Sequence, residues 1–570
     1  MATDTTSRQE TSTDEKWIPT TCGMCVYGGC ATRAHVVDGV LTKIEGNPEA
    51  LHNLGRLCPR GNAVIMDLYD PYRVKVPMKR TNPEKGLDVD PKFVEITWEE
   101  ALDIVVEKLK AVRDEDPRGF FINGGLSSGS PGVLGFQKLF GSTHNIHYLG
   151  GQGACGNAEH SVSAWTHFAG LSGWDPEYTD LFIQVGGGAG FGSWLGGAGC
   201  GVQRMADARV ERGMRVVIID PRCSEGGNKA NQWIPIVPGT DLALFLAMMH
   251  VMLHELNQYD VELLKRHTNG PYLIRPDGYY MKDSEKPEKP LVWDTAAQEA
   301  RPWDEVEPND VALEGVYEVN GEPCRPALQM VKDRMVPYTP EWQEPITTVP
   351  AATIRKLAAD FVTSAKIGAT ITLDGIEFPY RPVSIIGYHG LNRHMNSPFN
   401  VMAFNLINAL VGSYDVPGGN TGWPVNELGL PFDPYNMPPP ADGVLELVPW
   451  AEVGGTPTDM DLHQLYPMTW DAAANPKWTL TDPELREKFK IPYTFKVMLQ
   501  SAGNPFRSMG DPRQTEKAYQ AIEFIVSHAL WIDDPTLFAD VVLPSPGKLE
   551  GLGIQQYLWL WRISVEGTMI

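Results

Sequence analysis

The sequence predicts an α/β protein in which two doubly wound α/β units follow a cysteine-rich N-terminal domain. Three observations predict it: four cysteines within residues 17–75, a strand–glycine turn–helix–strand unit at 180–220, and a second such unit at 494–543. Short apolar strands that alternate with amphipathic helices are typical of parallel sheets covered by helices. We therefore expect an N-terminal domain at 17–75, a first α/β domain at 95–270, an insertion at 270–345 and a second α/β domain at 346–555.

Composition excludes several classes of protein. The 570 residues are enough for several cores, and 42% hydrophobic with 21% charged residues excludes wholesale disorder. A net charge of −23 argues against a nucleic-acid partner, because phosphate binding needs a basic face. No apolar run reaches the roughly 20 residues of a membrane span. Residues 1–15 lack the features of a twin-arginine or Sec signal, so we expect a cytoplasmic location, or a periplasmic one if the N-terminus is processed or a partner carries the signal.

The strongest local signal is the cysteine spacing near the N-terminus. Cys22, Cys25 and Cys30 follow a Cys-x2-Cys-x4-Cys pattern, and Cys58 comes after 27 further residues and precedes a proline. Four thiolates suit either a structural zinc ion or a [4Fe–4S] cluster. Zinc sites usually contain two Cys-x2-Cys pairs, so a triplet with a distant Cys-Pro favours the cluster. The alternative is four unrelated buried thiols.

The first half of the chain predicts a hairpin over 35–44 that turns at Asp38-Gly39. A capping box, Thr97 to Glu100, opens an amphipathic helix, and Gly119 to Asn123 reads as a short apolar strand.

The unit at 180–220 has the layout of a nucleotide-binding fold. A strand over 180–185 runs into a glycine-rich stretch at 186–192, and a helix then leads to a strand over 215–219 that ends at Asp220. In this layout phosphates lie near the helix N-terminus and the acid contacts a ribose or base. The strict Gly-x-Gly-x-x-Gly pattern is absent, so a tight packing turn is the alternative.

The second half of the chain predicts further helices and strands. The insertion at 270–345 lacks apolar helical periodicity and is rich in Pro, Lys, Glu and Asp. The expected elements are helices at 242–256, 351–365, 401–411 and 513–520, a buried strand at 367–373, and strands at 494–499, 522–527 and 539–543.

Together these motifs resemble the molybdenum/tungsten bis-pterin oxidoreductases, the dimethyl sulfoxide reductase family. The matching stretches, in order, are the cysteines with Cys58-Pro-Arg60-Gly, Asp220-Pro-Arg222, Pro238-Gly-Thr-Asp241, Ala502-Gly-Asn504-Pro505, and 538–544 followed by Glu550. The resemblance spans residues 17–555 and implies a dimethyl sulfoxide reductase-like fold. The family continues into a C-terminal domain that caps the cofactors, so the resemblance implies that 556–570 begin a truncated C-terminal region and that this domain is absent from the chain.

The resemblance also implies a [4Fe–4S] cluster and two molybdopterin guanine dinucleotides around Mo or W. Cys22, Cys25, Cys30 and Cys58 would hold the cluster, and Arg60 would bridge it to the nearer pterin. The residues expected to bind the pterin cofactors, besides Arg60, are Gly186, Gly188, Asp220, Arg222, Gly239 and Asp241 for one dinucleotide and Asn504 for the other.

Three further residues are expected near the reacting metal. Cys155, between Gly153 and Gly156, matches the metal-ligand position of the Cys-ligand subgroup, and a thiolate suits Mo or W. The alternative is a buried free cysteine. Arg393 and His394 lie in a segment that approaches the active site in the family, where they could donate protons or hold an oxyanion. A surface loop is the alternative.

These residues support a catalytic subunit that transfers an oxygen or sulfur atom in a two-electron reaction on a small substrate. Electrons would pass through the cluster to an iron–sulfur partner subunit, with a membrane anchor behind it. The pattern looks most like the thiosulfate, polysulfide and arsenic-oxyanion reductases and the acetylene hydratase-like branch.

Two alternative functions stay open. One is a non-redox hydratase or a phenol hydroxyl-transferring or dehydroxylating enzyme with the same cofactors; Val26, where acetylene hydratase has an important Asp, argues against the hydratase. The other is an electron-relay subunit without Mo or W. The presence of Asp220, Asp241 and Asn504 argues against it.

Overall fold

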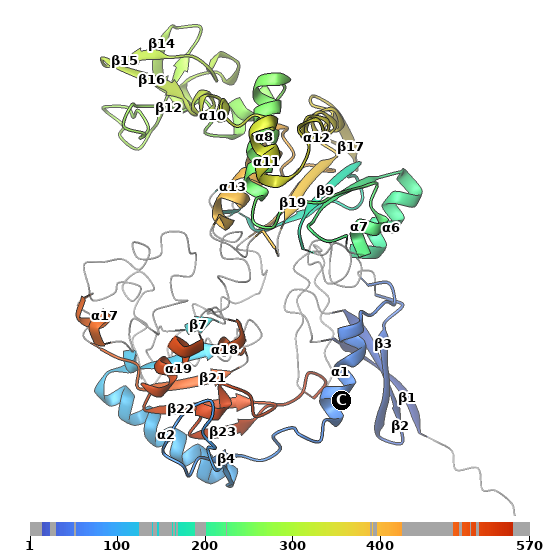
Figure 1. The fold of residues 1–570 in the computed structure, drawn as a ribbon, viewed down its shortest axis with the longest axis vertical. Coiled ribbons are helices and arrows are strands. Elements are labelled where there is room, and N and C mark those ends of the chain that lie inside the picture. Colours follow the sequence, from blue (N-terminus) through green and yellow to red (C-terminus); the bar gives the residue numbers. More distant parts are fainter. Residues whose placement is uncertain are drawn as a thin grey trace, which may run out of the picture. The chain divides into compact units, whose positions relative to one another are not determined.

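The N-terminal segment is a small antiparallel sheet with one helix. The computed structural model describes residues 14–22, 30–50, 53–124, 140, 145–147, 162–163, 166, 169–187, 201–223, 225–387, 390–391, 396–424, 483–488, 493–501, 503–508 and 512–550. Strands β1 (Glu15–Thr21), β2 (Ala31–Val37) and β3 (Val40–Gly46) form a sheet in that order, and α1 (Pro59–Tyr69) follows (Figure 1). The predicted hairpin is confirmed: Asp38 and Gly39 have φ of 50° and 79°, as a type I′ turn requires.

A second, seven-stranded sheet lies in the same compact unit as this segment. Its order is β5-β4-β23-β22-β21-β6-β7, and the last five of these strands are parallel. The short strands β4 (Met78–Lys79) and β5 (Val94–Glu95) extend it in antiparallel fashion. The parallel strands are β6 (Phe120–Gly124), β7 (Asn145–His147), β21 (Val497–Ser501), β22 (Phe524–Ala529) and β23 (Val541–Pro544).

Helices cover both faces of the seven-stranded sheet, because alternate strand residues point to opposite sides. Phe120 and Ile122 pack with Ala101 and Val112 of α2 (Trp98–Glu115). Phe121 points the other way and stacks on Phe495 at 4.1 Å, in a core shared with α18 (Pro505–Ser508) and α19 (Pro512–Gln520). The short helix α17 (Pro483–Lys488) precedes β21 in the chain.

The capping box predicted for α2 forms in part. The Thr97 hydroxyl accepts a hydrogen bond from the backbone N–H of Glu100 at 3.1 Å, so Thr97 is the N-cap. The Glu100 carboxylate pairs instead with Lys79 of β4, at 2.6 Å.

The second compact unit holds a four-stranded parallel sheet in the order β11-β10-β9-β19. The Asn408 side chain bonds the N–H and the C=O of Ile385 at 3.1 and 2.7 Å, which satisfies part of the open edge of β19. The strands are β9 (Leu181–Val185), β10 (Arg215–Ile219), β11 (Gln232–Ile234) and β19 (Val383–Gly387), and β8 (Ala169–Trp174) pairs separately with β20 (Asn420–Pro424). The main helices are α6 (Gly201–Arg212), α7 (Glu225–Lys229), α8 (Asp241–His250) with a π-turn over Val251–Glu255, α9 (Val261–His267), α12 (Ala351–Ser364) and α13 (Ser397–Leu410).

The two ranges expected as separate α/β domains, 95–270 and 346–555, each contribute strands to both parallel sheets. The strand β6 pairs with β21, and β9 pairs with β19, across more than 190 residues in each case. Parallel neighbours need a crossover connection, so strands that are adjacent in the sheet need not be adjacent in the chain. Periodicity locates strands but carries no information on which distant strands pair.

The buried strand predicted at 367–373 is wrong. Residues Thr370–Leu373 form β17, which pairs with β18 (Ile376–Pro379) in a partly exposed hairpin that turns at Asp374-Gly375. Both turn residues have positive φ, 49° and 81°, and an Asp-Gly pair is itself a hairpin signal. The buried strand of this region is β19, which was not predicted from the sequence.

The insertion at 270–345 contains regular elements, which corrects the expectation of an irregular segment. Its strands are too short to show periodicity, and a small core forms around the Trp293–Tyr317 stack, with ring centroids 4.4 Å apart. Its elements are β12 (Leu273–Ile274), β13 (Leu291–Asp294), β14 (Glu299–Pro302), β15 (Tyr317–Val319), β16 (Glu322–Pro326), α10 (Ala327–Met335) and α11 (Pro340–Thr347), with 3₁₀ turns at Trp303–Glu305 and Pro308–Asp310. Of the helices that the structure describes throughout the chain, none combines the length and apolar character that a membrane crossing needs.

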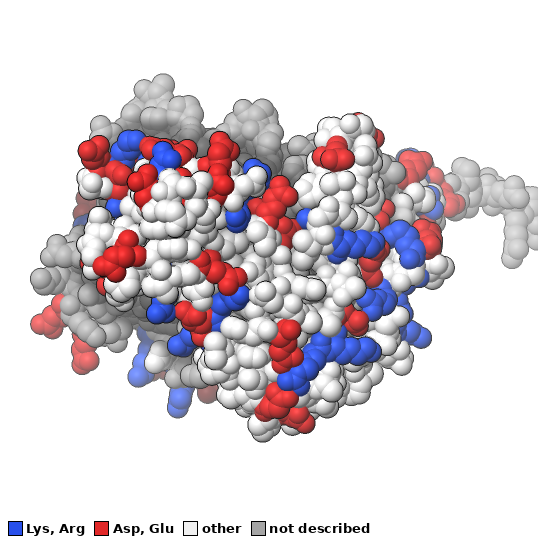
Figure 2. Space-filling model, turned by 90° about the horizontal axis from the view of Figure 1, so that it is seen from above, with Lys and Arg blue, Asp and Glu red and all other residues white. Residues whose placement is uncertain are grey.

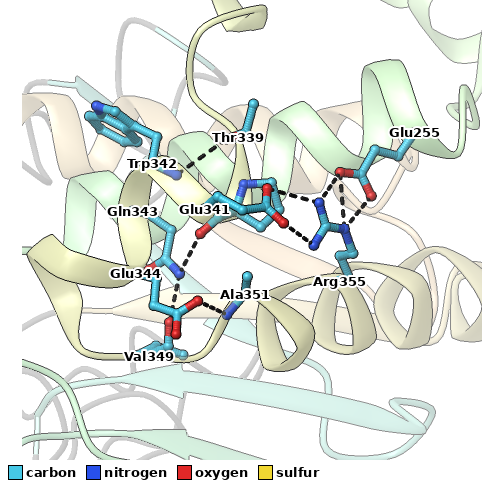
Figure 3. A network of polar contacts seen from close by, with 10 residues as sticks. Glu255, Thr339, Glu341, Trp342, Gln343, Glu344, Val349, Ala351 and Arg355 are labelled. Carbon is cyan, nitrogen blue, oxygen red and sulfur yellow. Dashed lines mark hydrogen bonds and ion pairs between the residues drawn. The ribbon is translucent and has the colours of Figure 1, made fainter.

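An arginine on α12 joins α12 to α11 and to the π-turn that follows α8 (Figure 3). Arg355 pairs with Glu255 of the π-turn at 2.8 Å and with Glu341 of α11 at 2.6 Å. Its hydrogen bond to Glu341 lowers the pKa of that carboxyl from its ordinary 4.5 to about 2. Between about pH 2 and pH 4.5, the Glu341 carboxylate therefore binds fewer protons in the folded chain than in the unfolded chain. The ion pair consequently stabilises the fold more as the pH rises through this range.

Replacing Arg355 with glutamine is expected to remove this pH dependence. Because the pKa of Glu341 is depressed in the folded protein, the advantage of the wild type is complete above about pH 4.5 and is lost as the pH falls to about 2. Urea-unfolding midpoints of both proteins across this range measure it, and added salt should shrink the difference. Arg325→Gln, which removes one exposed pair with Asp333, is the matched control. A difference between wild type and R355Q that does not change with pH would contradict the prediction.

Candidate functional site

Two of the predicted cluster cysteines lie at the two ends of one loop. Cys22 follows β1 and Cys30 precedes β2, and the Cys22 N–H donates a hydrogen bond to the Cys30 carbonyl at 2.9 Å. Both side chains are buried, at 4% and 6% exposure, and neither forms a disulfide. The antiparallel pairing of β1 with β2 therefore brings the two cysteines together at one end of the sheet.

The start of α1 brings the third cysteine to the same place. Cys58 is the N-cap of α1, and Pro59 occupies its first turn, where a missing N–H costs nothing. A Cβ on Gly61 would lie 3.2 Å from the Cys22 sulfur and 2.4 Å from the Leu57 side chain. Glycine at this position therefore lets the first helical turn pass beside the Cys22 thiol. Arg60 lies in the same turn and is exposed.

Cys22, Cys30 and Cys58 fit a cluster in their chemistry, since they are thiols outside any disulfide, and the N–H groups at the start of α1 favour an anionic group. Cys25 lies outside the described residues. Among the residues that are described, no three His, Cys, Asp or Glu side chains are close enough to hold a metal ion by themselves.

The direction of the connections in the four-stranded sheet reverses between β9 and β19. From β9 the chain continues to β10 and β11 on one side, whereas β19 lies on the other side. In such sheets, ligands bind at the carboxyl ends of the strands where the order reverses. Gly186 and Gly187 leave β9 with φ of 64° and 79°. A Cβ on Gly390 would lie 3.7 Å from the Gly186 Cα, so bare backbone from two segments meets here. Such a surface admits a phosphate or pterin close to the main chain.

Asp220 lies at the carboxyl end of β10, as the sequence predicts, and is buried. Its Oδ1 accepts a hydrogen bond from the Arg222 N–H at 2.9 Å, and its carbonyl accepts one from the Trp233 indole at 2.9 Å. These bonds fix the backbone of the turn. The Arg222 side chain is exposed.

Gly239 and Asp241 lie at the entry to α8. The Thr240 N–H donates to the Val237 carbonyl at 3.3 Å, and Gly239 has a φ of 81°, which together with Pro238 gives a type II turn. Asp241 is the first residue of α8 and is buried. Carboxylates accept hydrogen bonds from the N–H groups of a guanine base or from ribose hydroxyls, so Asp220 and Asp241 suit those parts of a nucleotide rather than its phosphates.

The seven-stranded sheet has its own reversal, between β6 and β21. The strand β7 follows β6 on one side, while β22 and β23 follow β21 on the other. Beyond β21, Gly503 has a φ of 78° and Asn504 donates to Asp534 at 2.7 Å. Arg507 makes a bidentate pair with the same carboxylate, at 2.9 and 3.0 Å, and this pairing lowers the pKa of Asp534.

Several polar residues at this edge were not predicted from the sequence. Asn123 and Gln500 are each the next-to-last residue of a strand and follow an apolar run, and Tyr519 of α19 hydrogen-bonds to both. The sequence signal for Asn123 and Gln500 is a single amide residue directly after an apolar run, Phe-Phe-Ile in one strand and Val-Met-Leu in the other. His528, near the end of β22, is half-buried, and burial lowers its pKa, so the ring is neutral at pH 7.

The structure describes most of the predicted site residues but not all of them. Cys22 and Cys30 lie at one end of the small sheet, and the first turn of α1, with Cys58 at its N-cap and Arg60, passes beside Cys22. Gly186, Asp220, Gly239 and Asp241 belong to the four-stranded unit. The predicted residues that lie outside the described part of the chain are Cys25, Cys155, Gly188, Arg393 and His394.

Two protein-family models match the chain. The molybdopterin oxidoreductase Fe4S4 domain matches residues 15–70, which include the three described thiols, and the molybdopterin oxidoreductase model matches residues 73–555, which include both parallel sheets.

Similar proteins are found among curated sequences and solved structures. A sulfite dehydrogenase subunit of Allochromatium vinosum is 27% identical over 93% of this chain and 58% of its own length. The molybdopterin-containing subunit of the arsenate respiratory reductase of Shewanella is 26% identical over 93% of this chain and 55% of its own. The structure of acetylene hydratase from Pelobacter acetylenicus matches with a TM-score of 0.64 at 19% identity, over 96% of this chain and 65% of that one, and shows the shared fold. The chain thus spans somewhat more than half the length of these two curated relatives.

Proposed function

The chain belongs to the molybdopterin oxidoreductase family, and from this we propose that it is the catalytic part of a Mo or W enzyme that transfers an oxygen or sulfur atom to or from a small substrate. The single observation that carries the proposal is the presence, in one chain, of a thiol site together with two sheets whose reversal points are each bordered by glycine turns and polar side chains.

The residues of the chain would act mainly by holding cofactors. When bound, the Mo or W centre with its two pterin dinucleotides would supply the two-electron redox change. Asp220 and Asp241 would accept hydrogen bonds from the guanosine of one dinucleotide, and Asn504 would contact the other. The cysteines would hold the cluster that relays electrons, and Arg60 would offset negative charge between cluster and pterin. We further propose Cys155 as the metal ligand and Arg393 and His394 as groups that hold the substrate or move its protons.

A small oxyanion is the substrate class that we propose. The relatives reported above are named for sulfite and for arsenate, both oxyanions of p-block elements. In the reducing direction, the substrate would gain two electrons, and one of its oxygens would leave with two protons as water; oxidation would be the reverse. Both relatives are also named as subunits, which supports an iron–sulfur partner that exchanges electrons with the cluster.

Metal, nucleotide and turnover measurements on the anaerobically purified native protein test the proposal. We expect iron, Mo or W, and guanine nucleotide released by acid, together with oxidation of a reduced viologen that depends on arsenate, sulfite, thiosulfate or a related compound. Iron without Mo or W would leave an electron-relay protein and contradict the proposal. Turnover of an alkyne or phenol without any electron donor or acceptor would point to the non-redox alternative instead.

A further inference from the structure

A polar cluster is buried in the apolar core near the carboxyl ends of β6 and β21, which we call the β6–β21 edge. Asn123 of β6 and Gln500 of β21 lie directly opposite each other in the strand register, and Tyr519 of α19 packs over them. All three side chains are nearly inaccessible, at 4%, 3% and 1% exposure. The Tyr519 ring lies among apolar neighbours, with centroids 5.0 Å from Phe506 and 5.5 Å from Phe538.

The three side chains form a closed set of hydrogen bonds. The Asn123 amide donates to the Gln500 Oε1 at 2.7 Å and to the Tyr519 hydroxyl at 2.8 Å. The Tyr519 hydroxyl donates in turn to the Gln500 Oε1 at 2.6 Å. Burial raises the pKa of Tyr519, so the phenol stays protonated and acts as a donor. Because the Gln500 oxygen accepts two bonds, the orientation of its amide is fixed and its nitrogen must point away from Asn123.

The fixed amide holds the backbone of the following turn. The Gln500 Nε2 donates to the carbonyl of Gly503 at 3.1 Å, and Gly503 has a φ of 78°, a conformation that favours glycine. Asn504 follows immediately, and its amide donates to Asp534. The hydrogen bonds therefore run from the phenol of α19, through Gln500, to the residue that the proposed function assigns to a pterin dinucleotide.

Fold stability alone does not explain this cluster. Burying two amides and a hydroxyl costs free energy unless every bond is made, and apolar side chains of similar size would fill the same space without that requirement. The neighbouring core positions, Phe121, Met498 and Ile525, are apolar. The polar residues occur near the carboxyl ends of β6 and β21, the two strands between which the connections reverse, and ligands of such sheets bind at this position.

We propose that Tyr519 is a positioning residue, which orients Gln500 and through it fixes the Gly503-Asn504 turn for the dinucleotide at the β6–β21 edge. This inference rests on the proposed function. It assigns no contact between Tyr519 and the cofactor itself.

The test compares Tyr519→Phe with Tyr493→Phe in the cofactor-loaded protein. Tyr493 is the matched control, because it is a buried tyrosine of the same core cluster whose ring lies under the Arg118 guanidinium rather than in the hydrogen-bonded set. Release of guanine nucleotide is followed on mild warming, together with the thermal unfolding midpoint. We expect Y519F to release about half of its nucleotide roughly tenfold faster, because only one of two dinucleotides is affected and the hydroxyl's hydrogen bonds to Asn123 and Gln500 are lost. Y493F should release at the wild-type rate.

Gln500→Glu keeps the acceptor oxygen but loses the donor to the Gly503 carbonyl, so it should also speed the release of half of the nucleotide. This second variant tests the inference if Y519F does not fold. Uniformly faster release of all nucleotide, in step with a lowered unfolding midpoint, would show a merely structural role and overturn the inference. Wild-type release rates in both Y519F and Q500E would also overturn it. Absence of guanine nucleotide from the wild-type protein would instead overturn the proposed function.

Discussion

Cys58→Ala protein is expected to contain almost no cluster iron. Cys58 is a free thiol at the N-cap of α1, and the glycine-permitted approach of that helix brings it to the end of the sheet where Cys22 and Cys30 lie. Four thiolates usually hold a cubane cluster, so a site reduced to three cysteines should lose iron during purification. Iron and acid-labile sulfide per chain, with the visible absorption of the protein, measure the outcome.

Cys223→Ala is the matched control, because Cys223 is exposed, forms no disulfide and belongs to the other compact unit. It should retain wild-type iron. Iron in Cys58→Ala at the wild-type level would show that Cys58 is not a ligand and would leave the Cys-Pro-Arg segment without its proposed role.

Asp260→Ala is expected to lower the free energy of unfolding of the four-stranded unit by about 3–5 kcal/mol, the range seen when one member of a buried ion pair is removed. Asp260 and Arg381 are 3% and 7% exposed, and the two Arg381 nitrogens lie 2.9 and 2.7 Å from the Asp260 Oδ2. The other Asp260 oxygen caps α9 by accepting from the Leu263 N–H. The variant therefore leaves a buried guanidinium unpaired and also removes a helix cap. The urea-unfolding transition reports the change.

A double variant, Asp260→Leu with Arg381→Met, separates the two contributions. It removes both charges together, so it should lose much less stability than Asp260→Ala, even though the cap of α9 is gone. Asp260→Asn keeps the cap oxygen and should lie between these two. Equal losses in Asp260→Ala and in the double variant would mean that the cap and packing, rather than the unpaired charge, set the cost.

Local chemistry explains which parts of the fold could be predicted from the sequence. The Asp38-Gly39 hairpin, the Thr97 cap of α2 and the strand at 181–185 all depend on residues within a few positions of each other. The strand β19 could not be found in this way, because its five residues carry no turn signal of their own and its partner is distant in the chain. Asp374-Gly375, by contrast, is a local signal that predicts the hairpin of β17 and β18.

In the candidate site, too, residues within short motifs could be predicted from the sequence, and residues that depend on distant strands could not. The cysteine spacing and Asp220-Pro-Arg222 are short motifs, and the structure places their described residues at the end of the small sheet and at the carboxyl end of β10. Tyr519 carries no motif, because its role depends on two strands that meet only in the folded sheet. On the described part of the face in view, acidic and basic side chains are interspersed (Figure 2).

The pairing of β6 with β21 has a consequence for how the protein is made. Some 370 residues separate the two strands, so at bacterial or eukaryotic rates of translation β6 emerges from the ribosome roughly 20 to 75 s before its partner. The unit of β9, β10, β11 and β19 can close during that interval, while Phe121 still lacks Phe495, Phe506 and Tyr519, which share its core in the complete chain. The nascent chain thus exposes the Phe121 face of β6 for most of its synthesis, and we expect it to depend on a chaperone that binds there until the last strands appear.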